Sequence, residues 1–328
     1  MQTAGAIIPP AMTGPRVAAI VVNHNGGEDL PHCLEALTDQ SVPVDVVLVD
    51  CASTDGTRRL AVSPPAGVQG VPLDANLGYA GGCAAGLAVS PHAEILGFFN
   101  PDCFAAPDLF ARCLEVMEGE PRVGGVAPRL LRPGGQLLDS CGQVVSRWLL
   151  RVRDRGFGEP AVGRFSARED VLAACGAAMV YRRTALQEAA VDGEVFPADF
   201  IAFWEDVDLG WRVVNAGWRV VYEPRAQAVH RRGGTARPGR GRLLFRRPAP
   251  VQAWILLNRW ATLLRNLHAV DFFTRLPLLS LADLTMVLVV GVRNPAVFGH
   301  LLHGGPRLAR AWRQRRKLPR RRLAELPT

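Results

Sequence analysis

Hydrophobic and polar positions in the first hundred residues of the chain follow two different periods. Val17 to Val22 is an unbroken run of small and β-branched residues, which is typical of a strand buried on both faces of a parallel sheet. Apolar residues then recur with helical spacing at Leu30, Cys33, Leu34 and Leu37. Further apolar runs at 44–49 and 95–99 predict two more strands. This β–α–β alternation predicts an α/β fold with a mainly parallel sheet flanked by helices.

The second half of the chain differs from the first in composition and in the elements that it predicts. Residues 123–230 contain two further short apolar runs, at 177–181 and 218–222, which predict strands. Residues 233–247 are rich in Gly, Arg and Pro and predict a linker. Beyond the linker, broad apolar faces with helical spacing predict a helical C-terminal region.

Charge divides the chain at nearly the same place. Residues 1–230 carry 18 Arg and 27 acidic residues, a net charge of −9, whereas residues 231–328 carry 20 basic and three acidic residues, a net charge of +17. Such asymmetry predicts that the two parts meet different partners. We therefore expect a flexible leader (1–15), an α/β domain (16–235), and a C-terminal region (236–328) made of the linker followed by amphipathic and basic segments.

The cysteines and the N-terminus bear on the compartment. The seven cysteines form no CxxC pair and show no spacing with histidine that is typical of zinc sites. This usage predicts reduced thiols in a cytoplasmic setting. The first fifteen residues lack a basic segment followed by a long apolar run, so we expect a leader and not a signal peptide.

Polar motifs gather where the predicted strands end. Asp50 follows the second strand, where a carboxylate is the natural partner of a ribose hydroxyl or a base N–H. Asn76 to Gly82 offers small residues of the kind needed where backbone passes close to a ligand. Asn100-Pro101-Asp102 ends the third strand with one carboxylate, and Mg²⁺ or Mn²⁺ on a nucleotide diphosphate needs only one or two. Taken singly, Asp50 is a weak signal because an Asp that caps a loop such as 53–56 is common, and Asn100-Pro101-Asp102 is equally well explained as a turn with Asp102 capping the next helix. No GxGxxG opens the first helix, which argues against a dinucleotide enzyme.

Three carboxylates fall within four residues at Glu205, Asp206 and Asp208. If a helix begins here, Glu205 and Asp208 share one face and Asp206 points elsewhere, so the three acids have different roles. The alternative is an acidic helix N-terminus favoured by the helix dipole. His230 follows the strand predicted at 218–222, and a histidine taken alone is more often an ordinary loop or core residue than a ligand.

In this order, the motifs resemble those of family-2 glycosyltransferases of the GT-A fold, in particular rhamnosyltransferase-like members. The resemblance covers about residues 16–235. It rests on Asn23-His24-Asn25-Gly26, Asp50-Cys51-Ala52-Ser53-Thr54-Asp55-Gly56, Asn76-Leu77-Gly78 with Gly81-Gly82, Asn100-Pro101-Asp102, Glu205-Asp206-Val207-Asp208-Leu209 with Arg212, and His230. The chain departs from the family pattern at His24 (usually Tyr), at Cys51 (usually Asn or Asp) and at Cys83-Ala84 (an Asn pair). These departures bear on the base and the sugar of the donor.

The resemblance implies a role for each matched residue. The implied donor-binding residues are His24, Asp50, Ser53, Asn76, Gly78, Gly81, Gly82 and Asn100. The implied ligands of Mg²⁺ or Mn²⁺ on the diphosphate are Asp102 and His230. Asp206 would be the general base, and Glu205 would help to place the acceptor. On the acceptor side, the supporting residues would be Asp208, Trp204 and Arg212.

The chemistry agrees with these roles. A carboxylate within hydrogen-bond reach of a sugar hydroxyl can take its proton as the hydroxyl attacks, and a divalent cation neutralises the leaving diphosphate. A single base opposite the leaving group implies inversion at the anomeric carbon. We therefore predict an inverting, metal-dependent glycosyltransferase that moves rhamnose from dTDP-rhamnose to a lipid-linked or cell-surface glycan. The alternatives are UDP-galactose, UDP-glucose or another donor, an inactive sugar-binding relative, and a nucleic-acid or membrane adaptor.

The basic C-terminal region leaves three interpretations open. Leu276 to Val292 is only 17 residues long and contains Pro277 and Asp283, which argues against a membrane span. Nucleic-acid binding would rest on charge alone, without a recognised motif. We favour attachment to an anionic membrane surface through Trp- and Leu-rich helical faces, such as that of 254–267, and the basic run 307–322. Whether 276–292 inserts into the membrane or only lies on it stays open. This predicts a cytoplasmic, peripheral protein on the inner face of the cell membrane, with no nucleic-acid partner and with a homo-oligomer left open.

Overall fold

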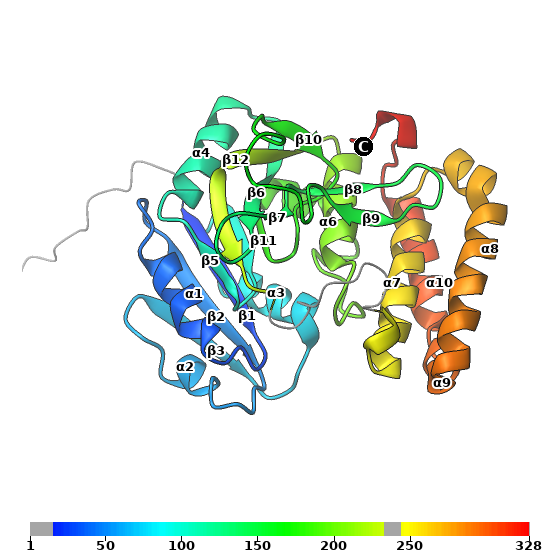
Figure 1. Cartoon of the computed structure of the whole chain (residues 1–328), viewed down its shortest axis with the longest axis horizontal. Coiled ribbons are helices and arrows are strands. Elements are labelled where there is room, and N and C mark those ends of the chain that lie inside the picture. Colours follow the sequence, from blue (N-terminus) through cyan, green and yellow to red (C-terminus); the bar gives the residue numbers. More distant parts are fainter. Residues whose placement is uncertain (1–15, 233–243, 328) are drawn as a thin grey trace, which may run out of the picture.

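The protein was analysed as a computed structural model, which describes residues 16–232 and 244–327. The predicted leader and most of the predicted linker lie outside the described residues. A mixed sheet runs through the body of the molecule, with helices on both faces and a group of long helices at one end (Figure 1). The strand order is β10-β12-β6-β11-β4-β1-β2-β3. This arrangement confirms the predicted α/β class.

One half of the sheet consists of four parallel strands. They are β1 (Val17–Asn23), β2 (Asp45–Cys51), β3 (Val68–Leu73) and β4 (Ile95–Phe99). All seven residues of β1 are buried, as expected for a strand that is covered on both faces. The helices of this half are α1 (Asp29–Thr38), α2 (Arg59–Val62) and α3 (Gly78–Ala88), whereas α4 (Leu109–Gly119) packs against the other half of the sheet. Because the four strands are parallel, their carboxyl ends meet at one edge of the sheet.

The other half is mixed. Its strands are β6 (Val123–Leu131), β10 (Glu169–Val171), β11 (Ala178–Arg182) and β12 (Arg219–His230), with the short β5 (Cys103–Ala105) and β7 (Leu138–Ser140) at its margin. β11 runs antiparallel to both β4 and β6. The prediction that the last strand ends before Pro224 is wrong, because β12 continues to His230. A register shift between Glu223 and Gln227 accommodates the proline.

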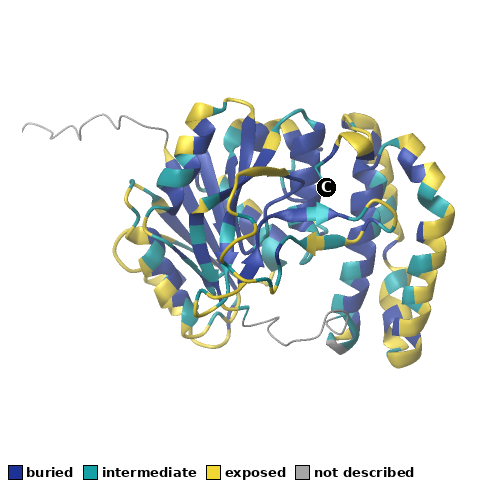
Figure 2. Ribbon diagram, turned by 45° about the horizontal axis from the view of Figure 1, so that its top comes forward, coloured by how far each residue is buried: buried dark blue, intermediate teal, exposed yellow. Residues whose placement is uncertain are grey.

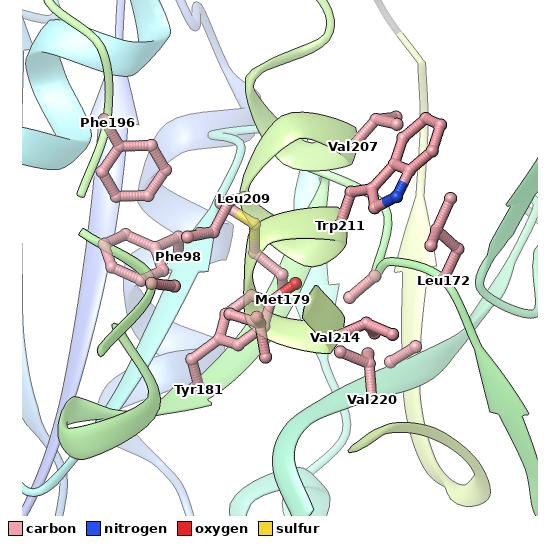
Figure 3. Packing of buried hydrophobic residues seen from close by; sticks show 14 of the residues in the cluster. Phe98, Leu172, Met179, Tyr181, Phe196, Val207, Leu209, Trp211, Val214 and Val220 are labelled. Atoms are coloured by element: carbon pink, nitrogen blue, oxygen red, sulfur yellow. The ribbon is translucent and has the colours of Figure 1, made fainter. Parts of the chain in front are cut away.

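The remaining elements lie between the sheet and the C-terminus. They are the separate hairpin β8 (Gln143–Val145) and β9 (Val152–Asp154), α5 (Arg183–Ala189), α6 (Glu205–Asn215), α7 (Ala249–Asn266), α8 (Ala269–Arg293), α9 (Ala296–Leu302) and α10 (Gly305–Gln314). Short 3₁₀ turns follow at 315–317 and 323–325. α6 packs its apolar face onto the sheet, and the close packing is visible in Figure 3 around Trp211, Met179 and Tyr181.

The C-terminal helices share the core of the α/β body. Ala261, Leu263 and Leu267 belong to the same buried cluster as the apolar residues of α6, and within Ala249–Asn266 no residue is exposed. The prediction that the apolar face of 254–267 contacts a membrane is therefore wrong. Burying a large apolar side chain is worth about 1.5–3 kcal/mol, and this face of α7 is used to join the helices to the sheet.

Many of the basic residues near the C-terminus pair with acids of the body. Arg310 lies 2.6 Å from Glu194 and Lys317 lies 2.5 Å from Asp192, and a third pair joins Arg265 to a buried carboxylate of α6. Part of the charge asymmetry of the sequence is thus complementarity within one molecule. The inference that the two charges must meet different partners does not hold for these residues.

α8 also corrects a sequence-based argument. The predicted apolar stretch of 17 residues is part of a helix of 25 residues that continues through Pro277. By length and composition, this helix is the one in the described part of the chain that could cross a membrane, with a mean hydropathy of 1.8 and 17% of its most apolar window buried. The argument from length against a span was therefore wrong.

Candidate active site

The carboxyl ends of β1 and β2 form a closely bonded polar cluster. Asn23 Nδ2 donates to Asp50 Oδ1 (2.7 Å), Ser53 Oγ (3.0 Å) and Thr57 Oγ1 (2.9 Å), and all four residues are buried. The backbone N–H of Ser53 donates to Asp50 Oδ2 (3.0 Å). Asp50 is fully buried, so its carboxylate supports the loops of this edge in addition to any contact with a donor.

The loops on this cluster lie at the surface. His24 is exposed, and its Nδ1 lies 2.8 Å from the carbonyl oxygen of Cys51. Asn25 Oδ1 accepts from the backbone N–H of Thr54 (2.7 Å). The two loops after β1 and β2 therefore form one unit, with His24 available at its surface for a planar ligand group.

The glycines after β3 are explained by contacts within the protein. Gly78 has φ +70°, and a Cβ there would lie 2.0 Å from the carbonyl oxygen of Ile201. A Cβ on Gly82 would lie 2.3 Å from a methyl group of Val22, and one on Gly81 would meet Leu77. Asn76 is exposed and caps the start of α3 by accepting from Gly78 N–H (2.8 Å). Their predicted role in donor binding stays a prediction, since packing alone accounts for the small residues.

The ends of β4 and β12 bring Asp102 and His230 together. Cys103 pairs with His230 across β5 and β12, and this pairing places Asp102 Oδ1 3.4 Å from His230 Nε2. On the other side of the ring, His230 Nδ1 lies 2.9 Å from Oδ2 of the fully buried Asp139. Arg232 Nε donates to the other oxygen of Asp139 (2.5 Å). Asn100, at the start of this motif, donates its N–H to Ala177 O (3.0 Å).

This pair fits a divalent cation held in part by substrate. Burial lowers the pKa of His230, but hydrogen bonds and charges from Asp102 and Asp139 outweigh burial and raise it to about 9. A cation bound at Nε2 would therefore displace a proton from the imidazole. A carboxylate on the far nitrogen of a histidine is the usual support of a metal-binding imidazole. Residues 16–232 and 244–327 contain no group of three or more His, Cys, Asp or Glu side chains that could hold a metal ion by itself. Two protein ligands suffice when phosphates and waters complete the coordination.

The three acids at the start of α6 lie in three different environments, as the helical spacing predicts. α6 begins at Glu205. Asp206 is partly exposed, whereas Glu205 and Asp208 are buried. An acid at the first turn is favoured by the helix dipole, but that effect alone does not account for the separate partners described below.

Asp206 is held by three donors. Its Oδ2 accepts from Gln143 Nε2 and from the Gly176 N–H, both at 2.9 Å. Its Oδ1 accepts from the Val207 N–H at 2.8 Å. Burial raises the pKa of Asp206 above its ordinary value, and the two backbone donors offset this only in part. A carboxylate has about four acceptor sites, so Oδ1 keeps a lone pair for a proton.

Glu205 is nearly unsupported. Its Oε2 has no hydrogen-bond partner among the described residues, and only 6% of the residue is exposed. Burial, together with the charges of Asp206 and Asp208, raises its pKa to about 8. Glu205 is therefore neutral at pH 7 and can donate a hydrogen bond to a ligand oxygen.

Asp208 is a structural carboxylate. It lies 2.9 Å from Arg212 Nε and 2.6 Å from Arg265 Nη1, and all three side chains are fully buried. Burial alone would raise the pKa of Asp208, but Arg265 and Arg212 hold it below its ordinary value. Asn266 Nδ2 also donates to Asp208 (2.9 Å). This network ties α6 to α7.

The turn before α6 is held by α7 as well. Phe203 and Trp204 have φ of 70° and 73°, in the left-handed region that bulky residues seldom adopt. Asn258 Nδ2 donates to the carbonyl oxygens of Ala202 (3.0 Å) and Phe203 (2.9 Å). The guanidinium of Arg259 lies 5.7 Å from the ring centre of Trp204. These contacts from α7 stabilise the turn that aims Asp206.

A chain of polar contacts connects the two groups of site residues. Gln143 Nε2 bonds Asp206 and lies 3.5 Å from Asp154 Oδ1, and Asp154 Oδ2 accepts from Arg232 Nη2 (2.9 Å). Arg232 continues the chain to Asp139 and so to His230. The hairpin β8–β9, which supplies Gln143 and Asp154, therefore links Asp206 with the Asp102–His230 pair.

Sequence reasoning missed several of these residues. They are Asp139, Gln143, Asp154, Gly176, Arg232, Asn258, Arg259, Arg265 and Asn266. They come from several separate segments, and none of them belongs to one of the recognised motifs. Two signals were available. A ligand histidine such as His230 usually has a carboxylate on its other nitrogen, which could have been searched for. The largely apolar helix at 249–266 contains two arginines and two asparagines, which need polar partners.

Comparison with known proteins agrees with this geometry. The family model "Glycosyl transferase family 2" matches residues 18–189, more than half of the chain. Two N-acetylglucosaminyl-diphospho-decaprenol L-rhamnosyltransferases, from Mycobacterium tuberculosis strains CDC 1551 / Oshkosh and ATCC 25618 / H37Rv, are each 29% identical over 240 residues. The match covers 64% of this chain and 74% of each relative.

Solved structures share the fold at low identity. GalNAc-T7 with UDP, GalNAc and Mn²⁺ has a TM-score of 0.57 and 13% identity, covering 78% of this chain and 48% of that one. The mannosyltransferase PcManGT from Pyrobaculum calidifontis, with GDP-Man and Mn²⁺, has a TM-score of 0.54 and 22% identity, covering 92% and 84%. The chain thus spans about half of the first structure and most of the second. The protein is a GT-A glycosyltransferase and belongs to glycosyl transferase family 2.

Proposed function

We propose that this glycosyltransferase inverts the anomeric carbon, with Asp206 as the general base. The observation that carries the proposal is the state of Asp206. Its side chain is partly exposed at the start of α6, its pKa is raised, and one oxygen retains a site for a proton. A base with a raised pKa accepts the proton of an attacking hydroxyl more readily than an ordinary carboxylate.

The residues around Asp206 would keep it in place during transfer. Gln143 and Gly176 both donate to Oδ2, which directs Oδ1 toward the acceptor hydroxyl. Glu205, neutral at pH 7, would donate to an acceptor oxygen beside it. These donors are fixed before the reaction, so little reorganisation is needed as charge develops.

The donor would lie along the carboxyl ends of β1 to β4, over His24, Asn76 and Asn100. Asp102 and His230 would hold Mg²⁺ or Mn²⁺, which neutralises the charge that develops on the leaving nucleoside diphosphate. The fixed imidazole of His230, with Asp139 behind it, supports this assignment. Mn²⁺ in the GalNAc-T7 and PcManGT structures is consistent with it.

For substrates, we favour dTDP-rhamnose as donor and a lipid-linked or growing surface glycan as acceptor. The support is the rhamnosyltransferase from M. tuberculosis, whose name specifies a diphospho-decaprenol acceptor. UDP-galactose, UDP-glucose or a GDP-sugar is the second candidate, because the structural relatives hold UDP or GDP-Man. A lipid-linked acceptor is consistent with a peripheral protein on the cytoplasmic face of the membrane.

Calorimetric binding of dTDP, UDP and GDP tests the donor site. The purified chain should bind one of them with Mn²⁺, and EDTA should abolish that binding. Binding of dTDP alone supports the rhamnose donor, whereas binding of UDP or GDP alone replaces it. If the folded protein binds none of the three, the donor-site assignment is wrong, and an inactive relative or an adaptor is the better explanation.

A further inference from the structure

The outer face of α8 is a long apolar surface. Phe273, Leu281, Leu284, Leu288 and Val292 are each more than half exposed on this helix. A helix of 25 residues is about 37 Å long. Figure 2 shows that exposed positions predominate along it. Soluble monomers rarely expose continuous apolar patches of this extent.

This face is also free of charge. Within residues 273–292, every exposed residue is uncharged. The two acids of the helix are turned toward the protein, since Asp283 pairs with Arg259 at 3.1 Å and the buried Asp271 accepts from Arg322 and from the Leu323 N–H. Between residues 273 and 292 the helix thus keeps its acids on the inner side and exposes only neutral side chains, and its last residue, Arg293, is an exposed cation.

Two exposed tryptophans adjoin the N-terminal part of α8. Trp148, 71% exposed at the tip of the β8–β9 hairpin, lies under the guanidinium of Arg275 at 6.0 Å. Trp312 of α10 lies 6.4 Å from Phe272, centre to centre. At the other end of α8, Phe298 and Leu302 of α9 continue the apolar surface. Tryptophan favours the boundary between lipid and water.

Basic residues accompany this surface. Arg293 is exposed at the end of α8, and Arg313 and Arg316 follow Trp312. Among the residues that the structure describes, no acid lies within ion-pair distance of these three arginines. They complement an anionic surface, to which each arginine near the lipid adds about 1 kcal/mol of attraction.

We propose that the outer face of α8 and α9, together with Trp148, docks the protein on an anionic lipid bilayer, with α8 lying in the plane of the membrane. The inner side of α8 argues for this orientation. Leu279 and Val290 are buried, and a Cβ on Gly291 would lie 2.2 Å from the ring of Phe298. Extracting α8 to span the bilayer would break these contacts and the pair between Asp283 and Arg259.

The docking surface is connected to the active site through one hairpin. Trp148 is at its tip, and Gln143, at its base, bonds Asp206. Arg259 donates to the carbonyl oxygens of Leu149 (2.8 Å) and Leu150 (2.6 Å). This connection rests on the proposed function, in which Asp206 is the base for the acceptor. If the acceptor is membrane-bound, the hairpin would set the distance between Asp206 and the membrane surface.

Vesicle flotation of the full chain tests the docking. The protein should float with phosphatidylglycerol–phosphatidylcholine vesicles and less with phosphatidylcholine alone. The double variant Leu281→Glu/Leu284→Glu should bind vesicles about 100-fold more weakly or worse. In the docked state both leucines would be buried in lipid, and the burial of two leucines is worth at least that factor. The matched control is Val62→Glu on α2, at the opposite end of the molecule and equally exposed (61% against 66% for Leu281), which should float as wild type.

Three results would overturn the inference. One is flotation of the double variant equal to that of wild type. Another is a solution dimer, seen by ultracentrifugation, that the double variant disrupts while neither protein binds vesicles, because α8 would then be covered by a second copy. The third is retention of the protein in vesicles after alkaline carbonate extraction, which would indicate a span.

Nucleotide binding measured on the same samples separates this inference from the proposed function. Binding without flotation removes only the docking, and flotation without binding removes only the donor site.

Discussion

The proposed donor side and the proposed acceptor side of the candidate active site are built differently. On the donor side, Asn23 and Asp50 lie at the carboxyl ends of two adjacent parallel strands and bond each other and Ser53. On the acceptor side, Asp206 depends on Gln143 and Gly176, and its helix depends on Arg265 of α7. The first region is completed by its own loops, whereas the second is assembled from segments far apart in the chain.

The C-terminal helices therefore support the proposed acceptor side, because α7 bonds both α6 and the turn before it. α7 holds the left-handed turn before α6 and neutralises Asp208 inside the core. Damage to α7 is therefore expected to reach the acceptor side first, whereas the donor side should persist as a nucleotide-binding surface. The following predictions test whether the two sides respond independently to substitution, and the variants with the strongest expected effects come first.

Asp206→Asn should reduce transfer by about 10²–10⁴-fold, the usual contribution of a general base. Donor binding should be unchanged, because the amide keeps the shape of the side chain and the donor side does not use its charge. Initial rates and nucleotide calorimetry on the same preparation measure both. Asp170→Asn, which removes a surface partner of Arg219, is the control. A parallel loss of nucleotide binding in Asp206→Asn would show that the two sides are not separate.

Asp208→Asn should destabilise the fold by about 3–5 kcal/mol, because it leaves the buried Arg212 and Arg265 without their shared carboxylate. The measurement is the free energy of unfolding in urea. Asp45→Asn removes an exposed pair with Arg16 and should change stability by less than about 1 kcal/mol. Equal stability of the two variants would mean that α7 does not support α6 through this network.

Asn23→Ala should act mainly on the donor side. It removes the donor that Asp50, Ser53 and Thr57 share, which is expected to cost about 1–3 kcal/mol of stability. Nucleotide affinity should fall while the turnover number at saturating donor changes little. Gln69→Ala, exposed on β3 of the same half, serves as control. A fall in turnover with unchanged affinity would contradict the division.

Glu205→Gln should alter how stability depends on pH. The pKa of Glu205 is about 8 in the folded protein and ordinarily 4.5. Between these values the unfolded chain releases this proton and the folded protein keeps it, so stability falls as pH rises, by up to about 1.4 kcal/mol between pH 6 and pH 7. The fall ends above pH 8.

Glutamine cannot ionise, so the variant should show a shallower slope in unfolding experiments from pH 5 to pH 8. Glu118→Gln, exposed on α4, should retain the wild-type slope. If the Glu205 variant retains it too, Glu205 is already ionised in the folded protein and its proposed role as a hydrogen-bond donor is wrong.

The α/β class, the strands β1, β2 and β4, and the order of the motifs could be predicted from the amino-acid sequence alone. Continuous runs of β-branched residues and turn residues such as Asn100-Pro101 act locally, so they can be recognised without knowledge of the rest of the chain. Parallel strands then bring their carboxyl ends to one edge, which is why the contacts of Asn23 and Asp50 could be expected.

Only the tertiary structure decided what surrounds the predicted residues. Asp139 and Gln143 reach His230 and Asp206 across 91 and 63 residues of chain, and no local pattern specifies such partners. The apolar face of 254–267 is buried although its composition suits a membrane, whereas α8 of similar composition is exposed. Hydrophobic periodicity shows that a helix has an apolar face. It does not show whether protein or lipid covers that face, because both exclude water equally well.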